Sequence, residues 1–408
     1  MRNFNFKMIR SAVVILVATG LASVTAAKAD DFATLEKNAR GQSVYFNAWG
    51  GDDKINAYIR WAGDTLKQRY GITLTHVKLT DTAAAVSRIL AEKTAGRTSD
   101  GSVDMLWVNG ENFASMKRSG LLQDADWVSD LPNWRYTDEA ELPAIKLDFA
   151  VPTDGLEVPW GRAQLVFFHD TAYLSKPPQS AAELKDYILK NKGRFTYPQV
   201  PDFMGISFLK QMLIELTDQD AALYAPADEA DFEAVTAPLW SYLDEIHPHL
   251  WRGGRAFPQN YPAQRQLLAD GEIDIYMAFN PADASSAIAR GELPETVRPY
   301  AHDAGTLANV HFLAIPFNSG NRAAAIITAN FMLSPEAQLR KADPAIWGDP
   351  SVLSQGKLPK QTQDDFANLP KGIATLGPAD LAKTLAEPHP SWVPKLEAAW
   401  KKRYGVAN

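Results

Sequence analysis

Residues 44–53 read VYFNAWGGDD, and this stretch decides the fold class because an apolar strand ends in it where a helix can begin. The run over residues 44–48 predicts a strand, and the two glycines that follow Trp49 break it. Asp52 or Asp53 can then cap a helix with one apolar face, which ends at Gly71. A strand, a glycine loop and a helix in this order indicate an α/β protein.

The same pattern continues along the chain. Residues 72–79 alternate as a second strand, and residues 103–108 predict a third, buried one. Between them, Thr82 can cap a helix that turns Val86, Ile89 and Leu90 inward. Strands alternating with amphipathic helices predict mainly parallel sheets, which place ligand contacts at the carboxyl ends of their strands.

A second set of such elements fills the rest of the chain. Strands are expected over residues 163–168, 194–197, 273–277 and 310–315. Helices are expected over residues 181–189, 203–216 and 322–333, up to residue 268, and in the tail over 381–385 and 392–404.

The amino terminus has the pattern of a secretory signal peptide. Arg2, Lys7 and Arg10 precede an apolar run over residues 12–22, and the small residues Ala27 and Ala29 permit cleavage before Asp30. The apolar run is about half of the ~20 residues that cross a bilayer. We therefore expect residues 1–29 to be removed on export to the periplasm, with no lipid anchor because no cysteine follows the run and no later membrane insertion.

Composition narrows the classes of partner. The formal net charge is −7, and removal of a basic leader makes it more negative, which argues against nucleic acid or an anionic membrane as a partner. The chain has 0 cysteines, so an exported form has no disulfides and depends on core packing.

Four segments carry a family pattern when taken in order. They are VYFNAWGG at residues 44–51, VPWGRAQLVFFHD at 158–170, DGEIDIYM at 270–277, and AIPFNS at 314–319 followed by FMLSPEAQ at 331–338. Together they resemble the periplasmic solute-binding proteins of ABC importers, in the class that includes binders of thiamine, iron, polyamines and sugars. Residues 47–51 and 107–113 are most similar to the thiamine-type branch. Iron-binding relatives use a tandem tyrosine pair, which this chain lacks.

The resemblance implies a periplasmic-binding-protein-like α/β fold of type II, with two doubly wound lobes joined by a two-strand hinge. Residues 30–160 with 300–408 would form the first lobe, including the C-terminal helices, and residues 161–299 the second. A monomer would hold a small solute between the lobes and pass it to a permease and its ATPase, and no cofactor or metal is expected.

The candidate ligand contacts lie in loops, near the hinge or at strand ends. They are Trp49, Gly50, Asn109, Glu111, Asn112, Trp160, Gln164, Tyr197, Asn260, Tyr261 and Asn280. An aromatic pair with one or two carboxylates suits a flat cation through cation–π attraction. Some of them have an equally plain structural interpretation: Trp49 as a core residue, residues 109–112 as a helix cap, and Tyr197 packing against a turn.

Two other functional classes stay open. An exported hydrolase would need catalytic groups, yet the chain has no Gly-x-Ser-x-Gly, His-Glu-x-x-His or phosphate-loop motif, and His247-Pro248-His249 is typical of a turn. A triad assembled from distant residues escapes such a search. A ligand-sensing module for a membrane receptor would have the same two-lobed form. Thiamine or a phosphorylated relative, another cationic nutrient, and a sugar or sugar phosphate all remain as ligands.

Overall fold

The computed structural model describes Met1 and residues 32–125, 127–377 and 379–405. The expected signal peptide lies outside these described residues apart from Met1. Residues Asp31–Asn408 cluster as one compact unit. Among the described residues, no helix has the length and apolar character required to cross a membrane.

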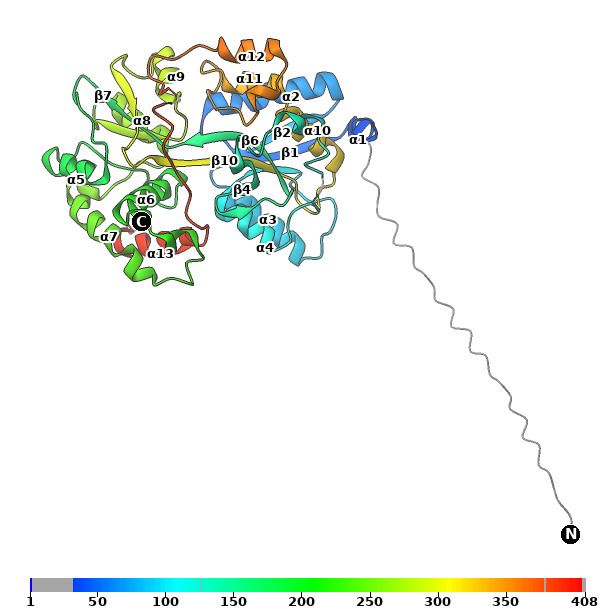
Figure 1. The fold of residues 1–408 in the computed structure, drawn as a ribbon, viewed down its shortest axis with the longest axis horizontal. Helices are drawn as coiled ribbons and strands as arrows, with labels where there is room; N and C mark the ends of the chain where they lie inside the picture. The colour runs from blue at the N-terminus through cyan, green and yellow to red at the C-terminus, as the bar shows by residue number, and fades with distance from the viewer. Residues whose placement is uncertain (2–31, 126, 378, 406–408) are drawn as a thin grey trace. The chain divides into compact units, whose positions relative to one another are not determined.

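Two larger sheets, each with helices around it, organise this unit, and a third sheet consists of two short strands, β4 and β5 (Figure 1). The strands are β1 (Ser43–Trp49), β2 (Thr73–Leu79), β3 (Met105–Val108), β4 (Leu147–Asp148), β5 (Val151–Pro152), β6 (Glu157–Gln164), β7 (Val166–Asp170), β8 (Ile275–Ala278), β9 (Val297–Tyr300), β10 (Thr306–Ala314) and β11 (Thr384–Leu385). The helices are α1 (Phe32–Ala39), α2 (Asp53–Tyr70), α3 (Ala83–Thr94), α4 (Gly110–Arg118), α5 (Ala181–Lys190), α6 (Phe203–Leu216), α7 (Phe232–Ile246), α8 (Tyr261–Ala269), α9 (Asp283–Ala289), α10 (Arg322–Met332), α11 (Pro335–Ala342), α12 (Lys360–Ala367) and α13 (Trp392–Tyr404).

The first sheet has the order β11-β10-β3-β1-β2, with β6 paired to β10. β1 runs parallel to β2 and β3, as the sequence pattern predicts, whereas β10 is antiparallel to both β3 and β6. The helix α2 begins where expected, because Asp52 accepts hydrogen bonds from the amides of Lys54 and Ile55 at 2.8 and 3.3 Å. It ends at Gly71, whose φ of 70° favours glycine.

The helix α3 departs from expectation in two details. Thr82 occupies the N-cap position, but its hydroxyl donates to the backbone oxygen of Trp107 at 3.3 Å instead of capping the helix. Leu90 was expected to face inward and is 44% exposed, because the buried face of α3 is formed by Ala85, Val86 and Ile89.

The second sheet is antiparallel, which corrects the expectation of mainly parallel sheets. β7 lies between β8 and β9 and is antiparallel to both. The strand expected over residues 194–197 lies outside any described strand, with isolated hydrogen bonds from Asp274 N to Arg194 O and from Trp251 N to Phe195 O. Pro198 has no backbone N–H to continue a ladder, and the chain turns at residues 200–201.

Two neighbouring strands carry the chain between the sheets (Figure 1). β6 belongs to the first sheet and β7 to the second, with Leu165 alone between them. β10 runs beside β6 in a register that pairs Ala308 with Gln164 and Ala314 with Glu157. The amide of Leu165 donates to Leu307 O at 2.8 Å, so the pairing continues through the crossover.

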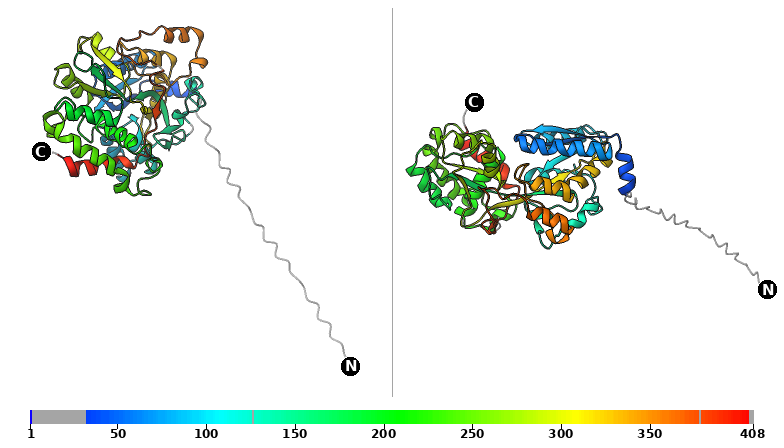
Figure 2. Two further views of the ribbon diagram at one scale, coloured as in Figure 1. Left: turned by 60° about the vertical axis from the view of Figure 1, so that its left-hand side comes forward. Right: turned by 90° about the horizontal axis from the view of Figure 1, so that it is seen from above.

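The C-terminal helix α13 packs into the core around the second sheet. The family resemblance instead predicts residues 300–408 in the first lobe. Trp392 and Trp400 of α13 are fully buried with Tyr197 and Phe208, and Trp400 Nε1 donates to Tyr197 Oη at 2.8 Å. In Figure 2, α13 lies among the helices that surround the second sheet. The helical piece expected at residues 381–385 is instead the short strand β11, which pairs with β10.

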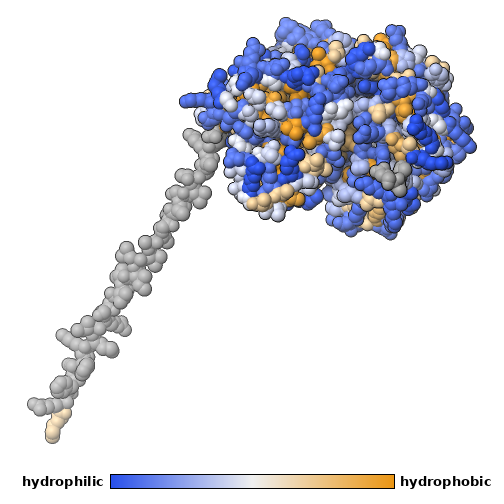
Figure 3. All heavy atoms as spheres, turned by 180° about the vertical axis from the view of Figure 1, so that it is seen from behind, coloured by the Kyte–Doolittle hydropathy of each residue, from blue (hydrophilic) through white to orange (hydrophobic). Residues whose placement is uncertain are grey.

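Exposed side chains show no single large apolar region on the face drawn in Figure 3. Hydrophilic residues dominate that face, and apolar residues show on it in smaller groups. Scattered apolar residues are normal on a folded surface, and the larger apolar clusters are buried around the two sheets.

Candidate functional site

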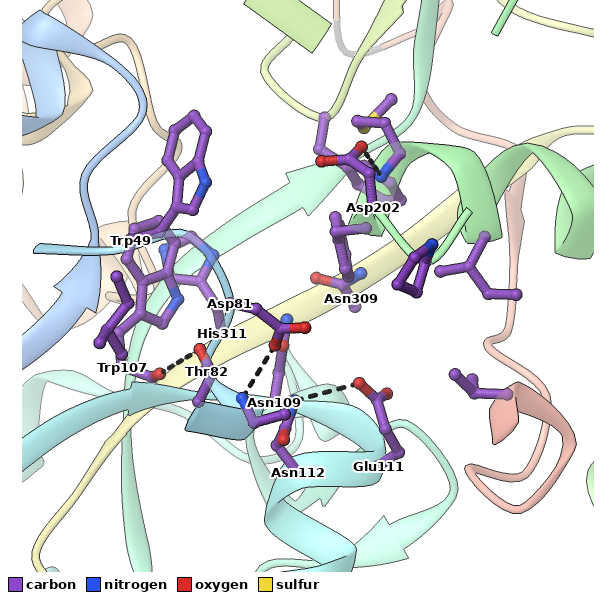
Figure 4. Close-up of a pocket in the computed structure, with 18 of the residues that line it drawn as sticks. Trp49, Asp81, Thr82, Trp107, Asn109, Glu111, Asn112, Asp202, Asn309 and His311 are labelled. Carbon is purple, nitrogen blue, oxygen red and sulfur yellow. Dashed lines mark hydrogen bonds between the residues drawn. The ribbon is translucent and has the colours of Figure 1, made fainter. Parts of the chain in front are cut away.

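A cavity of about 1780 Å³ lies between the structural elements of the two sheets. Its walls include the carboxyl ends of β1, β2 and β3, where parallel strands present their loops. The crossover strand β10 contributes Asn309 and His311, and the second sheet's side contributes Asp202, Tyr261 and Glu397. Figure 4 shows Trp49, Trp107 and His311 on one side of the cavity and Glu111 with Asn112 on another.

Eight of the eleven predicted contact residues line this cavity. They are Trp49, Gly50, Asn109, Glu111, Asn112, Asn260, Tyr261 and Asn280. Trp160, Gln164 and Tyr197 do not line it, and each has a different task in the fold.

Trp160 is a core residue instead of a ligand contact. Its ring is fully buried and lies 5.1 Å from Trp107, 5.2 Å from Trp347 and 5.9 Å from Phe46, measured between ring centres. Trp107 and Trp347 line the cavity in turn, so Trp160 supports the aromatic wall from behind.

Gln164 and Tyr197 join distant parts of the chain. The amide nitrogen of Gln164 donates to Thr306 Oγ1 at 3.1 Å and to Lys383 O at 3.2 Å, which ties the C-terminal tail to the crossover. Tyr197 Oη lies 2.8 Å from His247 Nε2 and accepts the hydrogen bond from Trp400. The His247-Pro248-His249 segment forms a 3₁₀ turn, and no group of side chains suited to a metal ion occurs among the described residues.

Trp49 and Tyr261 were both expected to meet a ligand, and the structure stacks them on each other. Their ring centres are 5.8 Å apart with an interplanar angle of 30°. Tyr261 Oη donates to Asp52 Oδ2 at 3.1 Å, so α8 is fastened to the start of α2. Gly51 must be glycine for this packing, since a Cβ there would lie 2.3 Å from Trp49 Cζ2.

The four predicted asparagines differ in their hydrogen bonds. Asn260 Oδ1 accepts from Ala263 N at 3.1 Å and caps α8. Both polar atoms of the Asn280 side chain form hydrogen bonds: Oδ1 accepts from Ala282 N at 2.9 Å, and Nδ2 donates to Trp347 O at 2.7 Å. Asn109 occupies the N-cap of α4 without a side-chain capping bond. Asn112 Nδ2 donates to Glu111 Oε1 at 3.0 Å.

Besides Asp52, whose carboxylate accepts hydrogen bonds from the start of α2 and from Tyr261, four carboxyl groups in the cavity wall have no ion-pair partner among the described residues: Asp81, Glu111, Asp202 and Glu397. Burial raises the pKa of Glu111, with Asp81 and Glu387 adding to the shift against Lys210. Burial raises the pKa of Glu397 to about 7, and Glu111 and Asp81 increase it. Burial raises the pKa of Asp202 to about 6 against backbone amide hydrogen bonds. The carboxyl groups therefore lie close enough to repel one another.

Sequence reasoning found only Glu111 of these four acids. Glu397 lies on α13, which the family resemblance assigns to the first lobe. Asp202 caps α6 by accepting from Met204 N at 2.9 Å. Asp81 follows β2 at its carboxyl end, a position that the strand-end rule could have identified.

A buried ion pair lies beneath the crossover strand. Lys210 Nζ of α6 donates to Glu387 Oε2 at 2.6 Å, and both side chains are 1% exposed. Asn309 Nδ2 of β10 donates to the other oxygen of Glu387 at 3.0 Å. This arrangement holds the cavity residue Asn309 in one orientation, because its donor is engaged by a carboxylate that is itself paired.

Comparisons with known proteins agree with this geometry. A family model described as bacterial extracellular solute-binding protein matches residues 61–370. Protein YnjB of Escherichia coli (strain K12) is 48% identical over 381 residues, covering 93% of this chain and 96% of the relative.

Two solved structures show the same fold at low identity. The periplasmic binding protein AfuA from Actinobacillus pleuropneumoniae, with fructose-6-phosphate bound, has a TM-score of 0.62 at 16% identity, over 90% of this chain and 99% of AfuA. The spermidine/putrescine ABC transporter substrate-binding protein PotD from Streptococcus pneumoniae has a TM-score of 0.59 at 17% identity, over 88% and 98% of the two chains. The α/β fold is thus that of the type II periplasmic binding proteins.

Proposed function

Because this chain belongs to the bacterial extracellular solute-binding protein family, we propose that it captures a small cationic solute in the periplasm and delivers it to an ABC permease and its ATPase. The family consists of binding proteins and not of enzymes, which removes the hydrolase alternative. Thiamine or a close relative is the first solute to test, since the sequence resembles the thiamine-type branch.

The observation that carries the proposed solute class is the set of acids in the cavity. The charge of Asp81 raises the pKa of Glu111, Asp202 and Glu397, and Glu111 also raises the pKa of Glu397. No described basic group forms an ion pair with these four acids. A cation placed among them would relieve this repulsion. Trp107 and His311 supply flat faces nearby, with their ring centres 5.1 Å apart.

The two larger sheets with their helices would form the two lobes that close around the solute. We assign residues 161–299 and α13 to the second lobe and the first sheet with its helices to the other, with β6, β7 and β10 as the hinge. A ligand drives closure only when it interacts better with the closed form than with the open one. Glu111 and Glu397 come from opposite lobes, so a cation between them favours closure.

The proposed binding role requires export of the protein to the periplasm. The basic residues, apolar run and small residues before Asp30 fit a signal peptide that is cleaved on entry to the periplasm. A monomer would suffice, because the cavity is built from one chain.

A thermal-shift screen tests the proposal. Purified protein is heated with thiamine, its phosphates, polyamines, sugars and sugar phosphates, and a ligand at 100 times its Kd adds about 2.7 kcal/mol to the stability of the folded form. We expect a rise in Tm with an organic cation, lost in E111Q/E397Q and retained in the exposed-surface control E233Q. A shift with neutral or anionic sugars alone would contradict the cationic solute class, and turnover of an ester or peptide without any shift would contradict the binding role.

A further inference from the structure

Lys54 lines the cavity and has a buried ammonium group. The residue is the second of helix α2 and lines the cavity wall, and its Nζ is buried without an acceptor among the described residues. An ammonium has three donors, and burying it without partners costs free energy that the fold must supply elsewhere. Such a group is typical of a binding site in which a ligand completes the hydrogen bonds.

The carboxylates near Lys54 are already engaged by other groups. Asp52 Oδ1 accepts from two backbone amides of α2, and its Oδ2 accepts from Tyr261 at 3.1 Å. Asp283 Oδ1 accepts from Arg265 at 2.8 Å, and its Oδ2 accepts from Tyr276 at 3.0 Å.

The two guanidinium groups of the same region are paired as well. Arg265 pairs with Asp283, and Arg290 forms an ion pair with Glu292. Lys54 is therefore the cation that the described residues of this cluster leave without a hydrogen-bond partner.

The electrostatic balance agrees with this geometry. Burial lowers the pKa of Lys54, the charges of Asp283 and Asp52 raise it, and Arg290 and Arg265 add to the lowering. The neighbouring acids therefore do not fully offset the cost of burying the ammonium. An added negative charge at Nζ would do so.

We propose that Lys54 Nζ donates hydrogen bonds to an oxyanion of the solute, so that the natural solute is an organic cation that also carries a carboxylate or phosphate group. This inference rests on the proposed function, because it names a second recognition element in the same cavity. The cationic part of the solute would lie among the acids described above, and its anionic part would meet the ammonium at the start of α2.

Calorimetric titration with thiamine and with thiamine monophosphate compares one cation with and without an oxyanion. We expect wild type to bind the phosphate ester about tenfold or more tightly, which corresponds to one charge-assisted hydrogen bond. K54M should lose this preference while binding thiamine within about twofold of wild type. The control K67M alters another lysine of α2, on its exposed face, and should keep the preference. Equal binding of both probes by wild type, or an unchanged preference in K54M, overturns the role of Lys54.

A test with inorganic phosphate distinguishes two outcomes: that Lys54 binds no oxyanion, and that thiamine is not the solute. If neither probe binds wild type, thiamine is excluded, and the Tm of each variant is measured with and without inorganic phosphate. A rise in wild type and K67M that K54M lacks supports the oxyanion site, whereas equal shifts in all three proteins overturn it.

The Tm of the unliganded K54M variant gives a further test. Since methionine keeps the length of the side chain and removes the buried charge, K54M should have a Tm equal to or above that of wild type. A lower Tm would assign Lys54 a structural role and count against the proposal.

Discussion

Tyr261 of α8 reaches Asp52 at the start of α2, 209 residues away in the chain, and donates a hydrogen bond of 3.1 Å to its carboxylate while its ring stacks on Trp49. The contact joins the helices around the second sheet to the first sheet at one edge of the cavity. Both partners of this contact are protein groups, so it ties α8 to the start of α2 at the edge of the site.

Removing this link should loosen the contact between the lobes. Y261F deletes the hydrogen bond to a charged acceptor and keeps the stacked ring, so we expect the free energy of unfolding to fall by about 1–3 kcal/mol. Urea unfolding measures the change, and small-angle scattering of the unliganded protein should show a larger radius of gyration. A wild-type radius in Y261F would mean that the contact does not hold the lobes.

Glu397 should make both stability and cation affinity depend on pH. Its pKa is raised to about 7 in the folded protein against a usual value of 4.5, so the folded state binds more protons between these values. Stability contributed by Glu397 is therefore present below about pH 4.5 and is lost as the pH rises toward 7. E397Q should lose less stability than wild type between pH 5 and pH 8, as followed by thermal unfolding.

Cation binding has the opposite dependence, because the ligand favours the ionised carboxylate. Affinity for a cationic solute should rise in wild type between pH 6 and pH 8, and E397Q should flatten this rise. Parallel profiles for the two proteins would show that Glu397 does not face the solute.

The buried pair of Lys210 and Glu387 should be intolerant of single substitutions. Losing one partner leaves a buried charge unpaired, so E387Q or K210M should lower the free energy of unfolding by about 3–5 kcal/mol. The double variant K210M/E387M should recover much of this loss, because neither charge then remains. Additive losses in urea unfolding would show that the two side chains act independently.

Substitution of Gly161 on β6 by any residue with a side chain should lower the stability of the protein. A Cβ at this position would lie 2.0 Å from Asp349 Oδ2 and 2.3 Å from His311 Nε2, inside a buried cluster that includes the ion pair of Lys341 with Asp349. G161A should cost about 1–3 kcal/mol of stability through this overpacking. Thermal unfolding checks it, with G377A as the comparison, where the nearest contact of an added Cβ is an ordinary 3.4 Å.

Local chemistry made several elements predictable from the sequence. The Asp52 cap, the break at Gly50 and the stop at Gly71 all act within a few residues, and α2 follows them as expected. The helix over residues 203–216 also has the predicted bounds. The ends of parallel strands correctly placed Trp49, Asn109 and Glu111 at the cavity, because that rule depends on strand order alone.

The direction of a side chain within the assembled core was decided by tertiary structure. Trp160 was predicted as a ligand contact beside the hinge and Tyr197 as one at a strand end, yet both are buried by segments from far along the chain, including Trp347 and Trp400.

The sequence by itself determined the strand–loop–helix elements, the family resemblance and the carboxyl-end residues of the first sheet, since short-range hydrogen bonds and periodicity encode them. Only the tertiary structure decided that α13 returns to the second core and brings Glu397 toward Glu111. It also decided that Lys54 Nζ is buried without an acceptor among the described residues. These properties depend on which residues distant in the sequence come into contact and on which groups are thereby kept apart. Local sequence patterns do not contain that information.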